Sequence, residues 1–213
     1  MSTEIRTAPP AEAARVHFDR WAGAYGRSRL LPSLQKKALA QLDLDPDDRL
    51  LDVACGAGAL VAEVAPRIAG AVGTDISEGM LQIARERVLD RPDAPANVEF
   101  RQASSEELPF TDGEFTAVVC TTALHHFPDA ERSIAEMARV LAPGGRVVIG
   151  DMCRDRVTTK LADPLWRRLE AGHVGMKTKR EIRSMLERSG LDVSASRGVW
   201  LGLYGLVVAD RPA

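Results

Sequence analysis

Two aspartates and two glycines with fixed spacing are the residues of this chain best suited to binding chemistry. Gly56 and Gly58 follow an apolar segment at 50–54, and Asp52 lies within that segment, close to the turn. Glycine has no Cβ, so its backbone can bend sharply and approach a ligand. Asp75 ends the next apolar segment, 23 residues after Asp52. A carboxylate about 20 residues after such a turn accepts hydrogen bonds from the ribose hydroxyls of nucleoside cofactors.

The glycine turn differs from the turns that bind phosphates. A dinucleotide fingerprint requires a third glycine, and its position is held by Val61; no Gly-Lys-Ser/Thr of a P-loop is present either. A carboxylate at Asp52 repels a diphosphate and attracts an ammonium group. The turn therefore favours a cofactor with a nucleoside part and a cationic part. An ordinary turn without a ligand is the alternative.

The residues after Asp75 predict one wall of the nucleoside site. Ser77 is a predicted helix N-cap, and Met80 follows one turn into that helix. Ile76 and Met80 can then hold an adenine ring between an aliphatic and a thioether surface. In the alternative interpretation, Asp75 is a solvated strand end and Met80 is an ordinary core residue.

Five motifs in a fixed order give the chain its family resemblance. They are Leu-Asp-Val-Ala-Cys-Gly-Ala-Gly at 51–58, Gly-Thr-Asp-Ile-Ser at 73–77, Ser-Ser-Glu-Glu-Leu-Pro-Phe at 104–110, Leu-His-His-Phe at 124–127 and Arg-Val-Leu-Ala-Pro-Gly-Gly at 139–145. From about Phe18 to its end, the chain resembles the class I S-adenosylmethionine-dependent methyltransferases, of the small type related to quinone-biosynthesis C-methyltransferases. The resemblance implies S-adenosyl-L-methionine as cofactor. It also implies in-line transfer of a methyl group to oxygen, carbon or nitrogen of a small molecule, such as a phenol or quinol.

The resemblance and the spacing together assign a set of cofactor-binding residues. These are Asp52, Ala54, Gly56, Gly58, Asp75, Ile76, Met80, Ser104, Ser105, Thr121 and Arg29. Two of them depart from the family pattern. Ser104 stands where the family has an acid for the adenine amino group, with Glu106 as a possible substitute. Ala54 stands where many relatives have glycine, and we expect it to keep a strand conformation.

The candidates for catalysis are His126 and Tyr25. Ligands bind beyond the carboxyl ends of strands in open α/β sheets, so Thr121, Thr122 and the His125–His126 pair are expected near the transferred methyl group. At most one of two adjacent histidines faces the site, and we assign His126 as a proton acceptor. Turn shaping is the alternative role.

The aromatic segment at 17–26 resembles the lid that folds over the cofactor in related enzymes. This places Tyr25 near the sulfonium, where a ring face favours cationic charge, and Arg29 near the cofactor's carboxylate. A helix that packs Phe18 and Trp21 on the sheet is the alternative. No His or Cys cluster with ligand spacing predicts a metal site.

Alternating strand and helix patterns predict the α/β class, with helices on both faces of a parallel sheet. Strands are expected at about 49–54, 71–75, 97–102, 115–121, 145–151, 191–197 and 202–209, and helices at about 59–68, 78–89, 129–141 and 178–189. The short link between the last two strands requires an antiparallel pair. The resemblance implies a doubly wound, Rossmann-like, seven-stranded sheet with an antiparallel last strand.

A single domain is predicted at 13–213, after a loose leader at 1–12. Within it we expect a helical lid at 13–42, a cofactor-binding core at 43–151 and a substrate side with the C-terminal strands at 152–213. The Leu165, Trp166 and Leu169 spacing is consistent with a helix core or with a substrate wall.

Composition narrows the partners of the 213-residue chain. Its net charge of −2 gives no basic field for nucleic acid or an anionic membrane, and no apolar stretch reaches membrane-spanning length. Three cysteines, each preceded by an apolar residue, indicate reduced core thiols, and we expect the protein in the cytoplasm. We expect a small-molecule substrate and a monomer or homodimer.

Two other functions remain open at this stage. An aminopropyl transferase on the same core normally carries a sizeable N-terminal β-extension, which these residues do not form. A non-catalytic, methyltransferase-like cofactor-binding or regulatory module is the second alternative, and the neutral Ser104 favours it.

Overall fold

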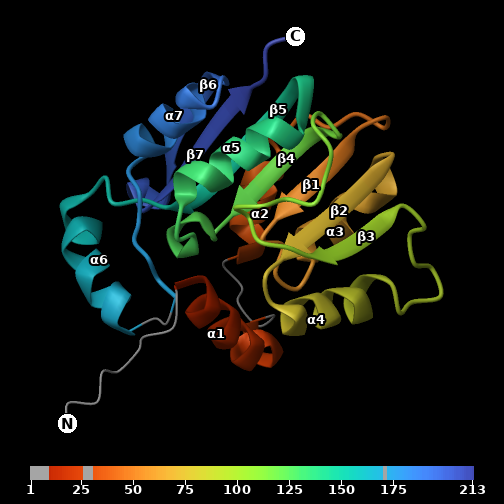
Figure 1. Ribbon diagram of the computed structural model, residues 1–213, viewed down its shortest axis with the longest axis horizontal. Helices are drawn as coiled ribbons and strands as arrows, with labels where there is room; N and C mark the ends of the chain where they lie inside the picture. The colour runs from red at the N-terminus through yellow and green to blue at the C-terminus, as the bar shows by residue number, and fades with distance from the viewer. Residues whose placement is uncertain (1–9, 26–30, 170–171) are drawn as a thin grey trace.

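The computed structural model describes residues 10–25, 31–169 and 172–213, without the side chains of 10–11, 21–25 and 31–32. A seven-stranded sheet forms the centre of the molecule (Figure 1). Its strands are β1 (Arg49–Val53), β2 (Gly70–Asp75), β3 (Val98–Gln102), β4 (Phe115–Thr121), β5 (Leu141–Met152), β6 (Asp192–Val199) and β7 (Tyr204–Asp210). β1, β4 and β7 come from mainly apolar runs because burial on both faces favours such sequence, whereas the edge strands β3 and β6 are largely polar.

The strand order is β3-β2-β1-β4-β5-β7-β6. β1 pairs in parallel with β2 and β4, and β4 pairs in parallel with β5. β7 is antiparallel to both β5 and β6. The predicted doubly wound sheet with an antiparallel last strand is therefore confirmed. Its order reverses between β1 and β4, the place where such sheets bind ligands.

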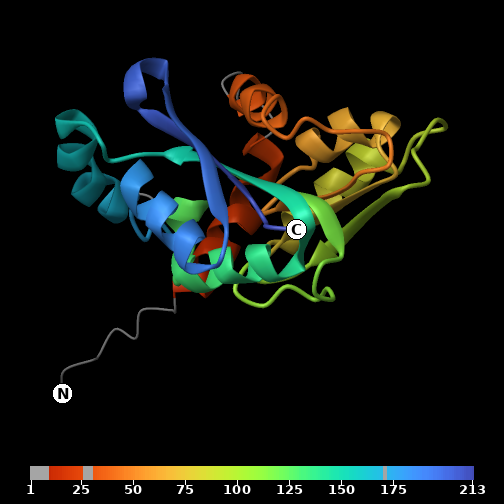
Figure 2. The same ribbon diagram turned by 90° about the horizontal axis from the view of Figure 1, so that it is seen from above.

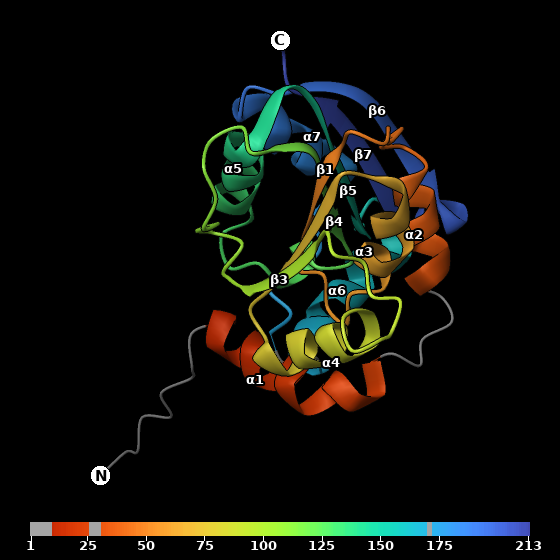
Figure 3. The ribbon, with the colours of Figure 1, turned by 90° about the vertical axis from the view of Figure 1, so that its right-hand side faces the viewer.

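Helices cover both faces of the sheet. They are α1 (Pro10–Tyr25), α2 (Leu31–Leu39), α3 (Ala59–Val64), α4 (Glu78–Val88), α5 (Ala130–Val140), α6 (Val157–Leu169) and α7 (Lys179–Arg188), with short 3-10 helices η1 (Ala65–Arg67), η2 (Leu124–His126) and η3 (Trp200–Gly202). The side view in Figure 3 has α5 and α7 on one face and α2 and α3 on the other. Two separate apolar cores match these faces: one joins α5 and α7 to the sheet, and the other joins α2, α3 and α4.

Local sequence signals determine several helix starts. Ser77 caps α4 by accepting the Met80 N–H, as predicted. Thr178 and Glu181 form a complete capping box at the start of α7. α1 begins at Pro10, before the boundary expected at residue 13.

The region after β5 differs from the sequence expectation. α6 lies at the outer side of the molecule, beyond the end of the sheet (Figures 1 and 2). Leu165, Trp166 and Leu169 are 57%, 43% and 75% exposed, so the helix-core interpretation of their spacing is wrong. The three cysteines are free and buried, as expected. Within the described residues, no helix is both long and apolar enough to cross a lipid bilayer.

Two glycines of β2 give a matched test of the packing between the sheet and the α4 face. A Cβ at Gly73 would lie 2.8 Å from the Cys55 Sγ and 2.8 Å from the Phe100 ring, whereas at Gly70 the nearest atom is 3.8 Å away. We expect Gly73→Ala to lower the free energy of unfolding by about 1–3 kcal/mol through overpacking. Gly70→Ala should change it by less than about 0.5 kcal/mol. Urea denaturation measures both, and equal effects would contradict this packing.

Candidate functional site

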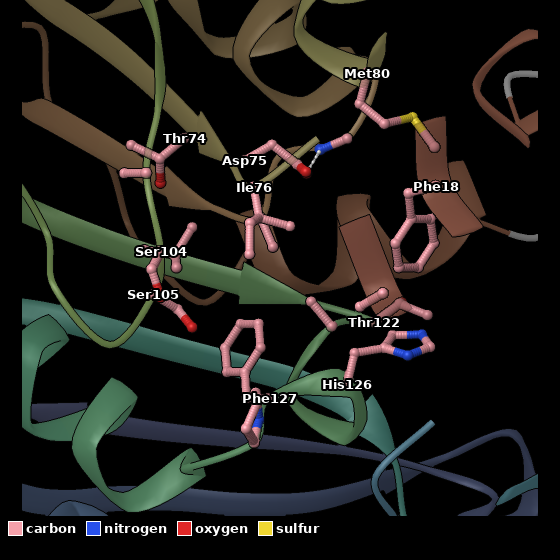
Figure 4. Close-up of a pocket in the computed structure, with 17 residues that line it drawn as sticks. Phe18, Thr74, Asp75, Ile76, Met80, Ser104, Ser105, Thr122, His126 and Phe127 are labelled. Atoms are coloured by element: carbon pink, nitrogen blue, oxygen red, sulfur yellow. Dashed lines mark hydrogen bonds between the residues drawn. The ribbon is translucent and has the colours of Figure 1, made fainter. Parts of the chain in front are cut away.

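One pocket gathers most of the predicted cofactor residues. It lies where β1, β2 and β4 end and is covered by α1 (Figures 1 and 4). Its walls contain Ala14, Phe18, Val53, Ala54, Gly56, Thr74, Asp75, Ile76, Met80, Ala103, Ser104, Ser105, Thr122, Ala123, His126, Phe127 and Pro128. Seven of these are predicted cofactor residues, namely Ala54, Gly56, Asp75, Ile76, Met80, Ser104 and Ser105. In Figure 4, Ser104 and Ser105 lie on one side and Phe18 and His126 on the other.

The Asp75 carboxylate connects two neighbouring loops at the rim of the sheet. Oδ2 accepts the Gly56 N–H at 2.9 Å, and Oδ1 accepts the Ser77 N–H at 2.9 Å. Burial raises the pKa of Asp75 to about 6, although these two N–H groups oppose the rise. The charged form is therefore expensive without a further donor, and a ligand with hydroxyl donors would stabilise it.

The two glycines of the turn have different roles. Gly56 takes a φ of 52° and lines the pocket. Gly58 takes a φ of 70° at the start of α3 and does not line the pocket. A Cβ there would lie 2.8 Å from the Phe100 ring and 2.9 Å from the Ala84 Cβ. Gly58 thus allows α3, α4 and β3 to pack closely, which is a structural role.

Ala54 contradicts the expectation of a strand conformation. Its φ is 59°, in the left-handed region, and it follows the last residue of β1. This region costs an L-residue about 1–2 kcal/mol because its Cβ approaches the following carbonyl oxygen. Alanine therefore occupies a position whose backbone suits glycine.

Asp52 is buried below the turn and is absent from the pocket wall. It is 1% exposed, and neither carboxylate oxygen has a hydrogen-bond partner among the described residues. Burial and the neighbouring Asp75 raise the pKa of Asp52 well above its usual range. Burying a charged carboxylate without a partner costs free energy, and a nearby cation would reduce that cost.

α1 closes the pocket and is tied to α4. The Asp19 Oδ1 accepts the Ser77 hydroxyl at 2.5 Å and the Gly79 N–H at 3.2 Å. Phe18, one residue earlier, lines the pocket and contacts the His126 ring edge to face at 5.0 Å between centroids. Phe18 therefore points toward the pocket. The helix α1 agrees in part with both interpretations of its sequence, since it covers the pocket like a lid and is packed against α4.

The serine side of the pocket departs from the acidic pattern of the family. The Ser104 Oγ accepts the Glu106 N–H at 3.2 Å, and the Ser105 Oγ lies 2.9 Å from the Ser133 Oγ. The Glu106 carboxylate instead accepts the Asp129 N–H at 2.8 Å and does not line the pocket. Glu106 thus does not take the place of the missing acid. Phe127, which sequence reasoning left without a role, lies across from Ile76 (Figure 4).

The two adjacent histidines point in different directions. His126 lines the pocket, and its Nδ1 lies 3.1 Å from the Gly172 carbonyl oxygen. Since a carbonyl oxygen only accepts, the Nδ1 N–H is the donor in this contact, which fixes the direction of the ring. The His125 Nδ1 lies 2.6 Å from the Asp151 Oδ1, buried away from the pocket. Asp151 therefore holds the turn at η2 and is not placed to act as a base in this pocket.

Adjacent threonines after β4 also separate. Thr121 ends the strand, is buried and does not line the pocket. Thr122 lines the pocket with a φ of 56°. Alternation of side chains along the strand end makes only one of the two available.

Two predicted residues cannot be placed. Arg29 lies outside the described residues, and Tyr25 ends α1 but its side chain is also outside them. Thr74, Thr122 and Phe127 are pocket residues that the assigned set lacked. Their shared signal is position, directly at or after the ends of β2 and β4. Across the described part of the chain, no group of three or more His, Cys, Asp or Glu residues could hold a metal ion.

Sequence comparison agrees with the geometry of this pocket. Residues 51–149 match the family described as a methyltransferase domain. The matched segment contains the glycine turn, Asp75, both serines and His126.

Curated relatives share this domain over part of their length. The uncharacterized methyltransferase YcgJ of Bacillus subtilis (strain 168) is 30% identical over 147 residues, which are 68% of this chain and 57% of the relative. The ubiquinone/menaquinone biosynthesis C-methyltransferase UbiE of Pseudomonas entomophila (strain L48) is 42% identical over 106 residues, 48% of this chain and 41% of the relative. The chain thus spans roughly half the length of these relatives.

Solved structures share the fold. A methyltransferase in complex with the Haloferax volcanii Trm112 activator has a TM-score of 0.81 and 20% identity, covering 92% of this chain and 98% of that chain. A geranyl diphosphate methyltransferase in complex with SAM has a TM-score of 0.74 and 19% identity, covering 84% of each. At this identity the likeness concerns the methyltransferase fold alone.

Replacing Ala54 by glycine tests the backbone of the turn. We expect Ala54→Gly to leave the free energy of unfolding unchanged or to raise it by up to about 1 kcal/mol, because relief of left-handed strain offsets the entropy of glycine. Ala62→Gly, inside α3, is the matched control. Its free energy of unfolding should fall by about 1 kcal/mol, because glycine is a poor helix former. Guanidinium denaturation measures both. A larger loss for Ala54→Gly than for Ala62→Gly would contradict the left-handed conformation.

The raised pKa of Asp75 predicts a pH-dependent stability. The folded pKa of about 6 lies above the ordinary value of 3.8, so the folded protein holds this proton more tightly. The resulting stabilisation, about 3 kcal/mol, is complete below pH 4 and disappears as the pH rises through 6. Asp75→Asn should flatten this fall between pH 4 and 6.5.

The exposed Asp93→Asn is the control for that slope. The pKa of Asp93 is lowered by Arg91, so its titration lies below the window. Urea unfolding at a series of pH values measures all three proteins. An Asp75→Asn slope equal to that of the unmodified protein would show that Asp75 titrates normally.

Proposed function

We propose that this chain is an S-adenosylmethionine-dependent methyltransferase that acts on a small-molecule acceptor. The observation that carries the proposal is the Asp75 carboxylate, held in the pocket wall between the Gly56 and Ser77 N–H groups. The matched methyltransferase domain includes this residue and the turn it contacts.

The residues of the pocket fit the nucleoside part of this cofactor. Asp75 would accept the ribose hydroxyls, which are the donors that its charged form lacks. In place of the Ile76 and Met80 pair expected from the sequence, we propose that Ile76 and Phe127 hold the adenine ring between them, beside Ser104 and Ser105, because Met80 lies next to Phe18 (Figure 4). Neutral serine hydroxyls bind less strongly than the charged acid of relatives.

The cationic part of the cofactor fits the buried charge below the turn. Asp52 has two carboxylate oxygens without a partner among the described residues, and a nearby ammonium group would favour their ionisation. We propose that Asp52 acts on the amino end through the glycine turn, since it does not line the pocket itself. Cofactor binding should then release protons from Asp52 and Asp75.

When bound, the cofactor supplies an electrophilic methyl group on a sulfonium. The chain's own residues position the reactants and exclude water, which contributes about 7–11 kcal/mol in well-oriented reactions. Phe18 on α1 covers the pocket, and we propose α1 as its lid. We propose His126 as the proton acceptor, because its imidazole lines the pocket beside Thr122. The roles first assigned to Tyr25 and Arg29, on the sulfonium and the carboxylate, remain part of this proposal.

A second candidate is a non-catalytic cofactor-binding module. The neutral Ser104 at the adenine position favours it, because weaker anchoring matters less to a sensor than to an enzyme. Incubating the protein with S-adenosylmethionine and panels of phenols, quinols and small amines distinguishes the two by mass spectrometry. Products one methyl group heavier support the enzyme, and cofactor binding without any product supports the module.

Cofactor binding should depend on Asp75 and on pH. We expect Asp75→Asn to weaken S-adenosylmethionine binding by about 10–100-fold, the loss of a hydrogen bond to a charged group. The affinity of the unmodified protein should rise between pH 5 and 7, because binding requires the ionised carboxylate. Isothermal titration calorimetry measures both.

The control for this experiment is Glu78→Gln. Glu78 lies in the first turn of α4, pairs with Arg85 and does not line the pocket, so its loss removes the same charge without removing the contact. Binding should stay within about twofold. If Glu78→Gln and Asp75→Asn weakened cofactor binding equally, the loss would reflect the change in charge alone. The assignment of Asp75 as a cofactor-binding residue would then be overturned.

A further inference from the structure

A second pocket lies beside the cofactor pocket and has a different chemical character. It is formed by α2, the ends of β4 and β5, α6, η3 and the start of β7. Its lining residues are Leu34, Thr122, Met152, Thr158, Thr159, Ala162, Trp166, Met176, Trp200, Leu203 and Tyr204. None of these described residues is Asp, Glu, His, Lys or Arg, and the one titratable side chain among them is the Tyr204 phenol.

Thr122 is the residue that joins the two pockets. It lines both of them, and its Oγ1 lies 3.1 Å from the Tyr204 hydroxyl. Its φ of 56° is unusual for a β-branched residue, and this strain is the kind retained at functional sites. The Thr122–Tyr204 hydroxyl pair therefore stands where a molecule in the second pocket would meet the contents of the first.

The second pocket opens to solvent through an apolar rim. Trp166, Trp200 and Leu203 line it and are 43%, 37% and 44% exposed. All the large exposed apolar side chains of the described residues lie on α6 or in the Trp200–Leu203 segment: Val157, Leu161, Leu165, Trp166, Leu169, Trp200, Leu201 and Leu203. Concentrated exposed apolar surface marks a binding site, and here Trp166, Trp200 and Leu203 of that surface also line the pocket.

We propose that this second pocket is the acceptor site, and that it takes an uncharged molecule with an apolar body and one hydroxyl group held by Thr122 and Tyr204. The inference rests on the proposed methyltransferase function, because it identifies the pocket next to the cofactor as the place of the acceptor. An acidic or quaternary acceptor would find no counter-charge in the lining, and burial of an unpaired charge is costly.

The polar end of this pocket is suited to a neutral group. Burial and the nearby Asp151 raise the pKa of Tyr204, so its phenol stays protonated and serves as a hydrogen-bond group, not as a base. His126 lies in the adjoining pocket with Thr122, which leaves the proton-accepting role to the imidazole. Recognition and proton transfer are thus assigned to different side chains.

Three probes of equal apolar body test the class of acceptor. These are 4-butylphenol, butylbenzene and 4-butylbenzoate, added to the protein with S-adenosylhomocysteine present and absent. Two of the three tryptophans line the pocket, so fluorescence quenching reports binding directly. We expect 4-butylphenol to bind at least tenfold more tightly than the anionic 4-butylbenzoate. Equal or tighter binding of the anion would overturn the proposal.

Two neighbouring positions on α6 locate the bound probe. Ala162→Phe fills the pocket and should weaken 4-butylphenol binding by at least tenfold, whereas Leu161→Phe, on a 75% exposed residue outside the lining, should change it by less than twofold. Tyr204→Phe should weaken 4-butylphenol by about 2–10-fold and leave butylbenzene unchanged, as expected for one neutral hydrogen bond. Equal responses of Ala162→Phe and Leu161→Phe would place the probe elsewhere.

Calorimetry with S-adenosylmethionine on the same variants tests the proposed methyltransferase function separately from the proposed acceptor site. Ala162→Phe and Leu161→Phe should keep cofactor binding, because neither residue lines the cofactor pocket. If the cofactor does not bind the unmodified protein, the proposed function fails. If it binds but the phenol does not, or binds without response to Ala162→Phe, only the acceptor site fails.

Discussion

The site depends on one buried carboxylate at the end of β2. Asp75 accepts N–H groups from Gly56 in the turn after β1 and from Ser77 at the start of α4, so a single side chain fixes two loops whose donors are 21 residues apart in the sequence. Its raised pKa of about 6 is the consequence of that burial. A nucleoside with two vicinal hydroxyls would supply the donors that the charged form lacks, which turns an energetic cost of the free protein into binding energy.

A second constraint comes from the helix that covers the pocket. Asp19 ties α1 to the first turn of α4, and Phe18 packs edge to face against His126 at one side of the pocket. The same histidine is bound through Nδ1 to the Gly172 carbonyl, which follows α6. The cover, the turn after β4 and the loop after α6 are therefore mechanically connected. Movement of α1 to admit a ligand would have to break these contacts.

The sequence predicted what depends on local pattern. Uninterrupted apolar runs located the strands, and the order of motifs indicated the sheet and the glycine turn. Side-chain direction was harder, because Thr121 and Thr122 differ by one position and only the second lines the pocket. Ala54 was misjudged because its backbone is set by the turn and not by its residue type. Asp52 is in the predicted strand, but whether its carboxylate reaches the pocket depends on packing that the motif does not encode.

The least predictable part was the segment after β5. The apolar residues Leu165, Trp166 and Leu169 at helical spacing in α6 were consistent with a helix core or with a substrate wall; all three are exposed, and only Trp166 of them lines the second pocket. Amphipathic spacing records which side chains share a face, but not whether protein, substrate or solvent covers it. The motifs that carry the family resemblance concern the cofactor site, and none of them lies in this segment.

A crystal structure of the complex with S-adenosylhomocysteine tests the central role of Asp75 most directly. The account requires both ribose hydroxyls within hydrogen-bond distance of the Asp75 carboxylate, with the adenine ring between Ile76 and Phe127. A ligand ordered at another place, or a ribose held by other side chains while Asp75 keeps only its two backbone partners, would contradict it.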